Sequence, residues 1–166
     1  MNKHVLVPFG EYLPFSTWLT PLLKYFSIPL SQLQAGNTLS EIRINQHPLA
    51  MLICYEIAYP HWVWKNNRHT LASVAITDDS WFNSTLATQE HLNILHMRTL
   101  ETQKNSVFVN DSGMSQIMLL PSEKHQPHTL TLRSGQTPVV RWGLLPMALL
   151  SLIAVFIRLR YKPQDE

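Results

Sequence analysis

Short apolar runs separated by turn-forming residues predict the strands of this chain. The two clearest runs cover residues 49–54 and 71–77, and each passes directly into polar residues. A run of this length that ends in polar residues is typical of a buried strand followed by a turn. Shorter runs predict further strands at residues 5–7, 42–44, 107–109, 116–120 and 129–132.

Helical spacing predicts two helices between these strands. Pro60 opens a short helix that continues to residue 67, because proline is favoured in a first helical turn. A longer helix is predicted over residues 85–104, with an apolar stripe formed by Leu92, Leu95, Met97 and Leu100. Strands that alternate with helices, followed by a β-rich end, predict an α/β fold with helices outside the sheet.

The C-terminal part of the chain has a different pattern, with no charged residue between positions 142 and 157. A buried helix would carry a polar stripe, but Ser151 is its only clearly polar side chain. We therefore predict a transmembrane helix over residues 139–161. Basic residues follow this segment more often than they precede it, so residues 162–166 are expected in the cytoplasm and residues 1–138 outside.

Composition limits the function classes. The 166 residues are 45% hydrophobic, which is enough to fill the core of one domain. The formal charge of +2 and the lack of an arginine-aromatic patch argue against a nucleic-acid partner.

Cys54 is the only cysteine, and it follows the apolar run 49–53. A lone cysteine more often packs in a core than reacts. A thiolate nucleophile would need a nearby cation or base, and several residues close to predicted strand ends are candidates. These candidates are Lys3, His4, Glu11, Glu56, His61, Asp78 and Asp79. No metal site is predicted, because His91 and His96 are five residues apart and do not share a helix face.

Several ordered motifs resemble one family. Residues 3–14 (KHVLVPFGEYLP) closely resemble a signature of the bacterial apolipoprotein N-acyltransferases, which belong to the nitrilase superfamily. Residues 53–56 (ICYE) look like the nucleophile motif of that family, and residues 78–82 (DDSWF) look like the motif that follows it. The helix over 89–101 and the basic C-terminal end are similar as well.

The resemblance implies roles for individual residues. It implies that Cys54 is the nucleophile and that Lys3 stabilises the thiolate and the oxyanion. The N–H group of Tyr55 would be a second oxyanion donor, and Glu11 and Glu56 would orient Lys3 and line the entrance. Two further residues, Trp81 and Phe82, would touch acyl chains or pack in the interior.

The resemblance also implies a fold, a reaction and a location. The fold would be a nitrilase-like αββα sandwich that faces the periplasm and is held in the inner membrane. The reaction would move an acyl chain from a phospholipid to Cys54 as a thioester, and then to the N-terminal amine of a diacylglyceryl-cysteine lipoprotein. No cofactor is implied.

The matching motifs cover only the last part of the family pattern. The general-base glutamate and several membrane spans of the family would precede Lys3, so we expect an incomplete sandwich that exposes a sheet face and an edge. A separate polypeptide would have to supply the missing half. Two alternatives stay open: an inactive truncated remnant or membrane-tethered interaction module, and a nitrilase-type amidase.

Overall fold

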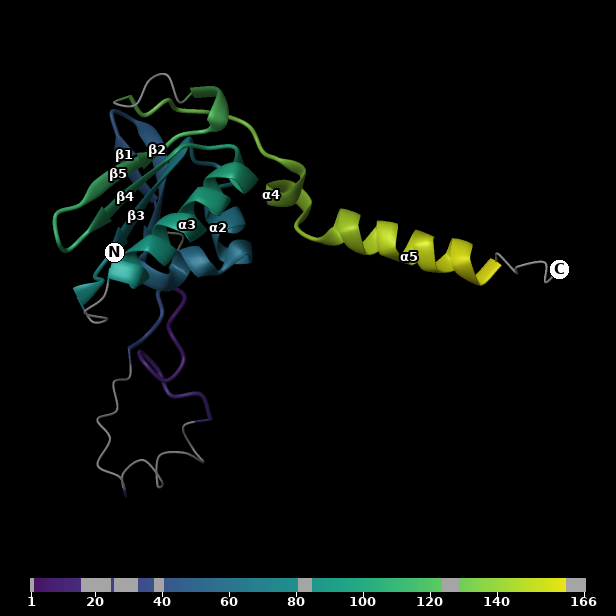
Figure 1. Cartoon of the computed structure of the whole chain (residues 1–166), viewed down its shortest axis with the longest axis horizontal. Helices are drawn as coiled ribbons and strands as arrows, with labels where there is room; N and C mark the ends of the chain where they lie inside the picture. The colour runs from purple at the N-terminus through teal and green to yellow at the C-terminus, as the bar shows by residue number, and fades with distance from the viewer. Residues whose placement is uncertain are drawn as a thin grey trace.

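The computed structural model describes residues 2–15, 25, 33–37, 41–80, 85–123 and 129–160. A single mixed sheet with the strand order β1-β2-β3-β4-β5 forms the body of the described chain (Figure 1). The three inner strands are parallel, and the two edge strands pair antiparallel to their neighbours. The strands are β1 (Glu41–Ile44), β2 (His47–Ile53), β3 (Ala72–Thr77), β4 (Ser106–Asn110) and β5 (Ser115–Met118).

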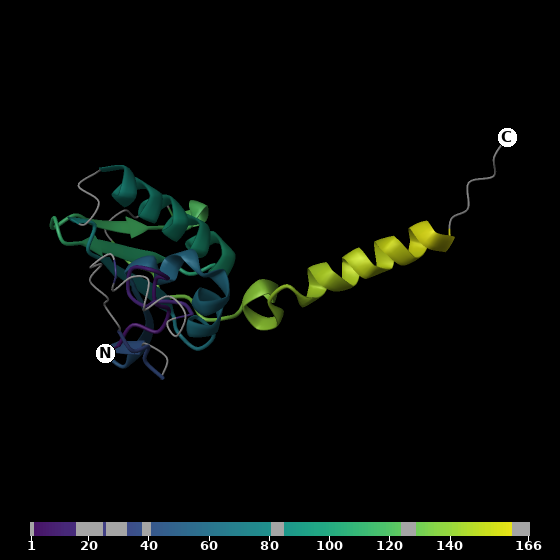
Figure 2. The same ribbon diagram turned by 90° about the horizontal axis from the view of Figure 1, so that it is seen from below.

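Helices connect the parallel strands, as a parallel pair requires. A short 3-10 helix, η1 (Cys54–Ala58), and α2 (Pro60–Asn66) lead from β2 to β3, and α3 (Thr85–Thr102) leads from β3 to β4. Both α2 and α3 lie on the same side of the sheet (Figure 2). A second 3-10 helix, η3 (Pro121–Glu123), follows β5. The predicted α/β fold is therefore confirmed.

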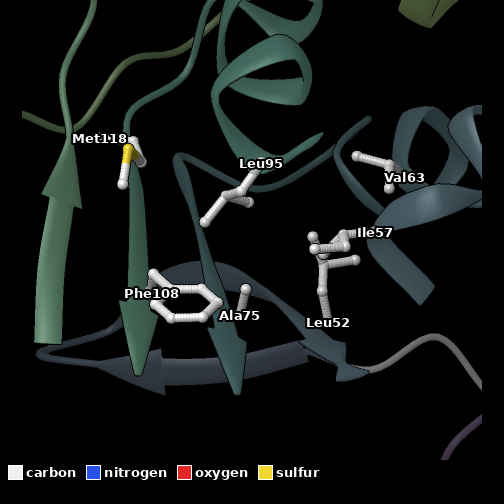
Figure 3. Packing of buried hydrophobic residues seen from close by; sticks show 7 residues of the cluster. All are labelled: Leu52, Ile57, Val63, Ala75, Leu95, Phe108 and Met118. Atoms are coloured by element: carbon white, nitrogen blue, oxygen red, sulfur yellow. The ribbon is translucent and has the colours of Figure 1, made fainter. Parts of the chain in front are cut away.

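The core fills the space between the sheet and these helices. Leu52, Ala75 and Phe108 are direct neighbours on the three parallel strands, and all three are at most 1% exposed. Their side chains point toward Leu95 of α3 and Val63 of α2 (Figure 3). Alternate residues of a strand point to opposite faces, so one face of the sheet supplies this core.

The opposite face of the sheet is apolar, and no helix of the described residues covers it in the same way. Met51, Val74, Val107 and Ile117 form one row across four strands, and Ile53, Ile76 and Val109 form a second row across three. None of these seven side chains is buried, and Ile76 is 39% exposed. We call this surface the open sheet face. It is what an incomplete sandwich would present, and the sandwich itself stays a prediction.

Two strands predicted from the sequence do not form. Residues 5–7 run irregularly because the N–H groups of Val5 and Val7 donate to the carboxylates of Glu56 and Glu11 and not to a neighbouring strand. Residues 129–132 are also irregular. There the carbonyl of Thr131 accepts from the Asn105 side chain, so it is not part of a strand ladder.

The stripe predicted on α3 is only partly correct. Leu95 is fully buried and Leu92 packs against the core, but Met97 and Leu100 are 55% and 39% exposed. Polar side chains take their place on the inner face of α3, and they are held by hydrogen bonds. The buried residues of α3 are His91, Leu95, Arg98, Thr99 and Thr102.

The C-terminal segment differs from the continuous helix predicted over residues 139–161. It forms α4 (Pro138–Trp142) and α5 (Leu145–Arg160), separated by a break at Gly143, where φ is +61°. Such a φ is unfavourable for residues with a Cβ atom and ends α4. Of the helices in the described chain, none combines the length and the apolar character needed to cross a membrane.

No residue of α5 is buried. The helix projects away from the sheet in both views (Figures 1 and 2). Its large apolar side chains are between 54% and 80% exposed, on every side of the helix. Exposed apolar surface of this extent marks a site of interaction.

Candidate functional site

Cys54 lies where a parallel strand ends and a sharp turn begins. It directly follows β2 and is the first residue of η1. Its φ is +53°, a left-handed conformation that side chains other than glycine rarely adopt. The surrounding structure must stabilise this strained turn, and strain of this kind concentrates at functional sites. The thiol is half-buried, at the edge of the sheet where α/β proteins bind ligands.

Glu56 holds that turn against the N-terminal segment. Its side chain is completely buried, and one carboxylate oxygen, Oε1, accepts from the N–H groups of His4 at 2.6 Å and Val5 at 3.1 Å. The other oxygen, Oε2, accepts from the N–H group of Ile53 at 2.8 Å. Since Lys3 precedes His4 and Cys54 follows Ile53, one carboxylate brings the backbone of both candidate residues to the same place.

Lys3 is oriented by the second glutamate. Its Nζ atom lies 2.7 Å from Oε1 of Glu11, and the two side chains are 11% and 25% exposed. The other Glu11 oxygen, Oε2, accepts from the N–H group of Val7 at 2.8 Å, which closes a compact loop over residues 3–11. A hydrogen-bonded ion pair with little exposure restricts the lysine to a narrow range of positions.

Tyr55 connects this turn to helix α3. Its ring meets the rings of Tyr59 and His91 edge-on, with centroids 6.1 Å and 6.2 Å apart. The side chain is 41% exposed, so Tyr55 also faces the solvent at the site. Edge-on contacts of aromatic rings at this separation are favourable and fix the direction of the ring.

A buried pair of Asp79 and His91 supports this contact. Oδ1 of Asp79 lies 2.7 Å from Nδ1 of His91, and hydroxyl groups of Thr77 and Thr88 donate to the same carboxylate. Burial opposes ionisation of Asp79, but these hydrogen bonds outweigh it and hold the pKa of this carboxyl below its usual value. Sequence reasoning named both residues without pairing them. Their only common signal is that both lie in segments that resemble the family motifs.

A cavity of about 540 Å³ opens beside this pair, at the carboxyl ends of β3 and β4. Asp79, Thr88, Asn110 and Met114 are among its lining residues. Trp81 and Phe82, which were expected to touch acyl chains, lie outside the described residues. Within the part of the chain that is described, no group of three His, Cys, Asp or Glu side chains could hold a metal ion.

The arrangement combines elements of acyl-transfer chemistry. A thiol lies at a strained turn, an oriented ammonium group lies on the adjoining segment, and the buried Glu56 carboxylate holds both segments in position. A thiol at a sharp turn, with an ammonium group on the adjoining segment, is an arrangement that could serve attack on a carbonyl carbon.

Curated proteins similar to this chain carry one name. The chain is 34% identical over 170 residues to the apolipoprotein N-acyltransferase of Coxiella burnetii, and the match covers 96% of this chain and 35% of that protein. The corresponding enzyme of Pasteurella multocida is 32% identical over 170 residues, covering 95% and 32%. That of Haemophilus influenzae is 31% identical over 168 residues, covering 94% and 32%.

These matches confirm the resemblance predicted from the motifs: the chain is a relative of the apolipoprotein N-acyltransferases over nearly its whole length. It spans about a third of the length of the curated relatives it matches. No protein-family model matches it. Among solved structures, an amidase of the nitrilase superfamily from Nesterenkonia is similar at 15% identity and a TM-score of 0.38, covering 49% of this chain and 30% of that one. That overlap is too small to define a shared fold.

Proposed function

We propose that this chain is the thiol-bearing part of an apolipoprotein N-acyltransferase. The observation that carries the proposal is that Glu56 binds both the turn at Cys54 and the segment of Lys3 through hydrogen bonds. The chain is also similar to these enzymes over nearly its whole length.

The first step of the proposed reaction forms a thioester. The Cys54 thiolate attacks the ester carbonyl carbon of a phospholipid, a C–S bond forms, and the ester C–O bond breaks. The lysophospholipid alkoxide leaves and takes up a proton. In this step Lys3 and the N–H group of Tyr55 would stabilise the negative charge on the carbonyl oxygen.

The second step transfers the acyl chain to an amine. The α-amino group of a diacylglyceryl-cysteine lipoprotein attacks the thioester carbonyl, a C–N bond forms, the C–S bond breaks, and the Cys54 thiol is regenerated. Two easier transfers replace one difficult transfer. We assign Glu11 and Glu56 to positioning, since their carboxylates hold Lys3 and the turn at Cys54.

A general base completes the proposed site. The resemblance assigns this role to a glutamate that comes before the motif containing Lys3, in the part of the relatives that this chain does not span. Without that general base, proton transfer from the Cys54 thiol is not catalysed, and turnover falls by about two to four orders of magnitude. We propose that this part of the enzyme packs on the open sheet face.

The proposed location is the bacterial inner membrane, with residues 1–138 facing the periplasm. Its support is α5, whose apolar side chains face outward on all sides. Apolar surface of this kind is stabilised by contact with lipid.

The decisive experiment measures thioester formation in membranes that contain a labelled phospholipid. We expect label on the wild-type chain, its loss with hydroxylamine, and none on Cys54→Ala. Because Cys54 is the only cysteine, no other thiol can account for the label. Addition of the part of a relative that this chain does not span should raise the yield.

Two outcomes would contradict this proposal. No label on a folded, membrane-bound chain, even after addition of the part of a relative that this chain does not span, would identify an inactive remnant. Hydrolysis of small amides without any acyl transfer would identify a nitrilase-type amidase.

A further inference from the structure

We infer that a basic cleft at the base of α5 binds the headgroup of an anionic phospholipid. The inference rests on the proposed lipid contact of α5 and adds a recognition site that is separate from the turn at Cys54. The cleft lies between α2, α4 and the first residue of α5, and its volume is about 190 Å³. Its lining includes Trp64, Lys65, Arg68, Arg141, Trp142 and Leu145.

All the charged side chains that line the basic cleft are positive. Lys65, Arg68 and Arg141 line it, and no Asp or Glu residue does. In the part of the chain that the structure describes, no carboxylate forms an ion pair with any of these three side chains. All three are exposed, so their charges are available to a ligand. A phosphate group is the ligand that such a cluster binds best.

Local contacts hold the basic side chains around the cleft. Nε of Arg68 donates to the carbonyl of Val140 at 3.3 Å, which fixes this guanidinium between the end of α2 and α4. The Arg141 guanidinium lies 5.4 Å from the ring centre of Trp142. These contacts reduce the freedom that a ligand would otherwise have to restrict on binding.

The position of the cleft identifies a lipid as the source of the phosphate. Leu145 belongs both to the cleft and to the exposed apolar helix α5. The views in Figures 1 and 2 show α4 between the sheet and α5. If α5 contacts lipid, its first turn lies at the level where headgroup phosphates are found. Tryptophan is enriched at that level of a membrane, and Trp142 would lie there.

The size of the cleft limits what can enter it. A volume of about 190 Å³ accommodates a phosphate with part of its glycerol, but not a complete phospholipid. The acyl chains of a lipid bound here would lie outside the cleft, along the apolar surface of α5. The cleft would therefore anchor the chain on an anionic membrane and set its orientation.

The test compares the binding of the full chain to phosphatidylcholine vesicles and to vesicles that also contain phosphatidylglycerol. We expect wild type to bind the anionic vesicles more tightly. Lys65→Gln and Arg141→Gln should each weaken that binding about fivefold while binding to neutral vesicles persists, because one basic side chain near an anionic surface is worth about that factor. Arg141→Lys should retain most of the preference.

The matched control is Arg43→Gln, which removes one exposed positive charge from β1, outside the cleft. An equal loss in this control would show only diffuse electrostatic attraction and would overturn the proposed headgroup site.

Equal binding of wild type to both kinds of vesicle would overturn the headgroup site alone. Binding to neither kind would overturn the proposed lipid contact of α5 as well. A last outcome would overturn the lipid assignment. Glycerol phosphate would saturate the cleft in the absence of vesicles, and Lys65→Gln and Arg141→Gln would bind both kinds of vesicle with wild-type affinity. The cleft would then be assigned to a soluble phosphate.

Discussion

The Glu56 carboxylate accepts hydrogen bonds from backbone N–H groups of two segments that lie about fifty positions apart in the sequence. We predict that Glu56→Gln lowers the free energy of unfolding by about 2 kcal/mol. The substitution removes the charge and places an NH₂ group against an N–H donor, and hydrogen bonds to a buried charged group are worth roughly 1.5–3 kcal/mol. Urea denaturation measures the change.

The control for Glu56 is Glu41→Gln, since Glu41 forms an exposed ion pair with Arg43. Exposed pairs of this kind contribute about 0–1 kcal/mol. Equal stability of Glu56→Gln and wild type would mean that the carboxylate does not hold the N-terminal segment against the turn at Cys54.

Asp79 gives the site a predictable dependence on pH. Its pKa in the folded chain is held below the ordinary value of 3.8, so the unfolded chain binds a proton first as the pH falls. Its contribution to stability is therefore complete above about pH 4 and is lost as the pH falls through the lower, folded value. Asp79→Asn should lose this contribution at neutral pH and show a flatter decline in acid.

Urea denaturation across the acid range checks the prediction for Asp79. The exposed neighbour provides a matched control, Asp78→Asn, which should keep the wild-type acid dependence. A variant at Asp79 that declines in acid as steeply as wild type would contradict the role assigned to its hydrogen bonds with Thr77, Thr88 and His91.

At the scale of elements, the sequence was most informative where local pattern and packing agree. The runs over 49–54 and 71–77 became β2 and β3, and the helix predicted over 85–104 became α3. These elements have a continuous apolar pattern, and they build the core. Their existence could therefore be predicted without knowledge of the rest of the fold.

Prediction failed where contacts of side chains decide the path of the backbone. Residues 5–7 have a strand pattern, but the carboxylates of Glu11 and Glu56 take the N–H groups that a strand would use. The pair of Asp79 and His91 was missed for a similar reason, since it depends on the packing of α3 against the end of β3. The resemblance supplied candidate residues, and the structure supplied their carboxylate contacts.

Helix α4 depends on one residue at its start. The Thr137 hydroxyl accepts from the N–H group of Val140 at 3.4 Å as an N-cap, and it donates to the carbonyl of Glu101 in α3 at 2.8 Å. Thr137→Val keeps the shape and removes both bonds, so we expect a loss of about 1 kcal/mol. Faster amide hydrogen exchange in residues 139–142 would report the same loss locally.

The control for Thr137 is Thr137→Ser, which keeps the hydroxyl group and should exchange as wild type does. If Thr137→Val leaves exchange in α4 unchanged, other contacts must hold α4 in place. Because α4 carries Arg141, loosening it should also reduce the preference of the chain for anionic vesicles.

At the scale of the whole molecule, the two faces of the sheet have unequal environments. Helices α2 and α3 cover the face with Leu52, Ala75 and Phe108, whereas the open sheet face remains accessible. Monomeric proteins seldom expose so continuous an apolar patch. We therefore predict that the isolated chain binds a hydrophobic dye and aggregates through this face.

The test replaces Ile76 and Val109, which are neighbours in the open sheet face, with threonine. Threonine keeps the β-branched shape, so the strands persist while the apolar surface shrinks. We expect less dye fluorescence and less light scattering, with stability changed by less than about 1 kcal/mol. Helix α5 also exposes apolar surface, but it is identical in both chains, so the difference reports the sheet alone.

Ala75→Thr provides the opposite case, since Ala75 lies on the covered face and is 1% exposed. Extra volume in a packed core costs about 1–3 kcal/mol, so this variant should be less stable and bind more dye. If Ile76→Thr with Val109→Thr behaves in the same way as Ala75→Thr, both faces are covered in solution. If only the open face tolerates threonine, that face is available for the part of the proposed enzyme that this chain does not span, and the same two substitutions should weaken the binding of that part.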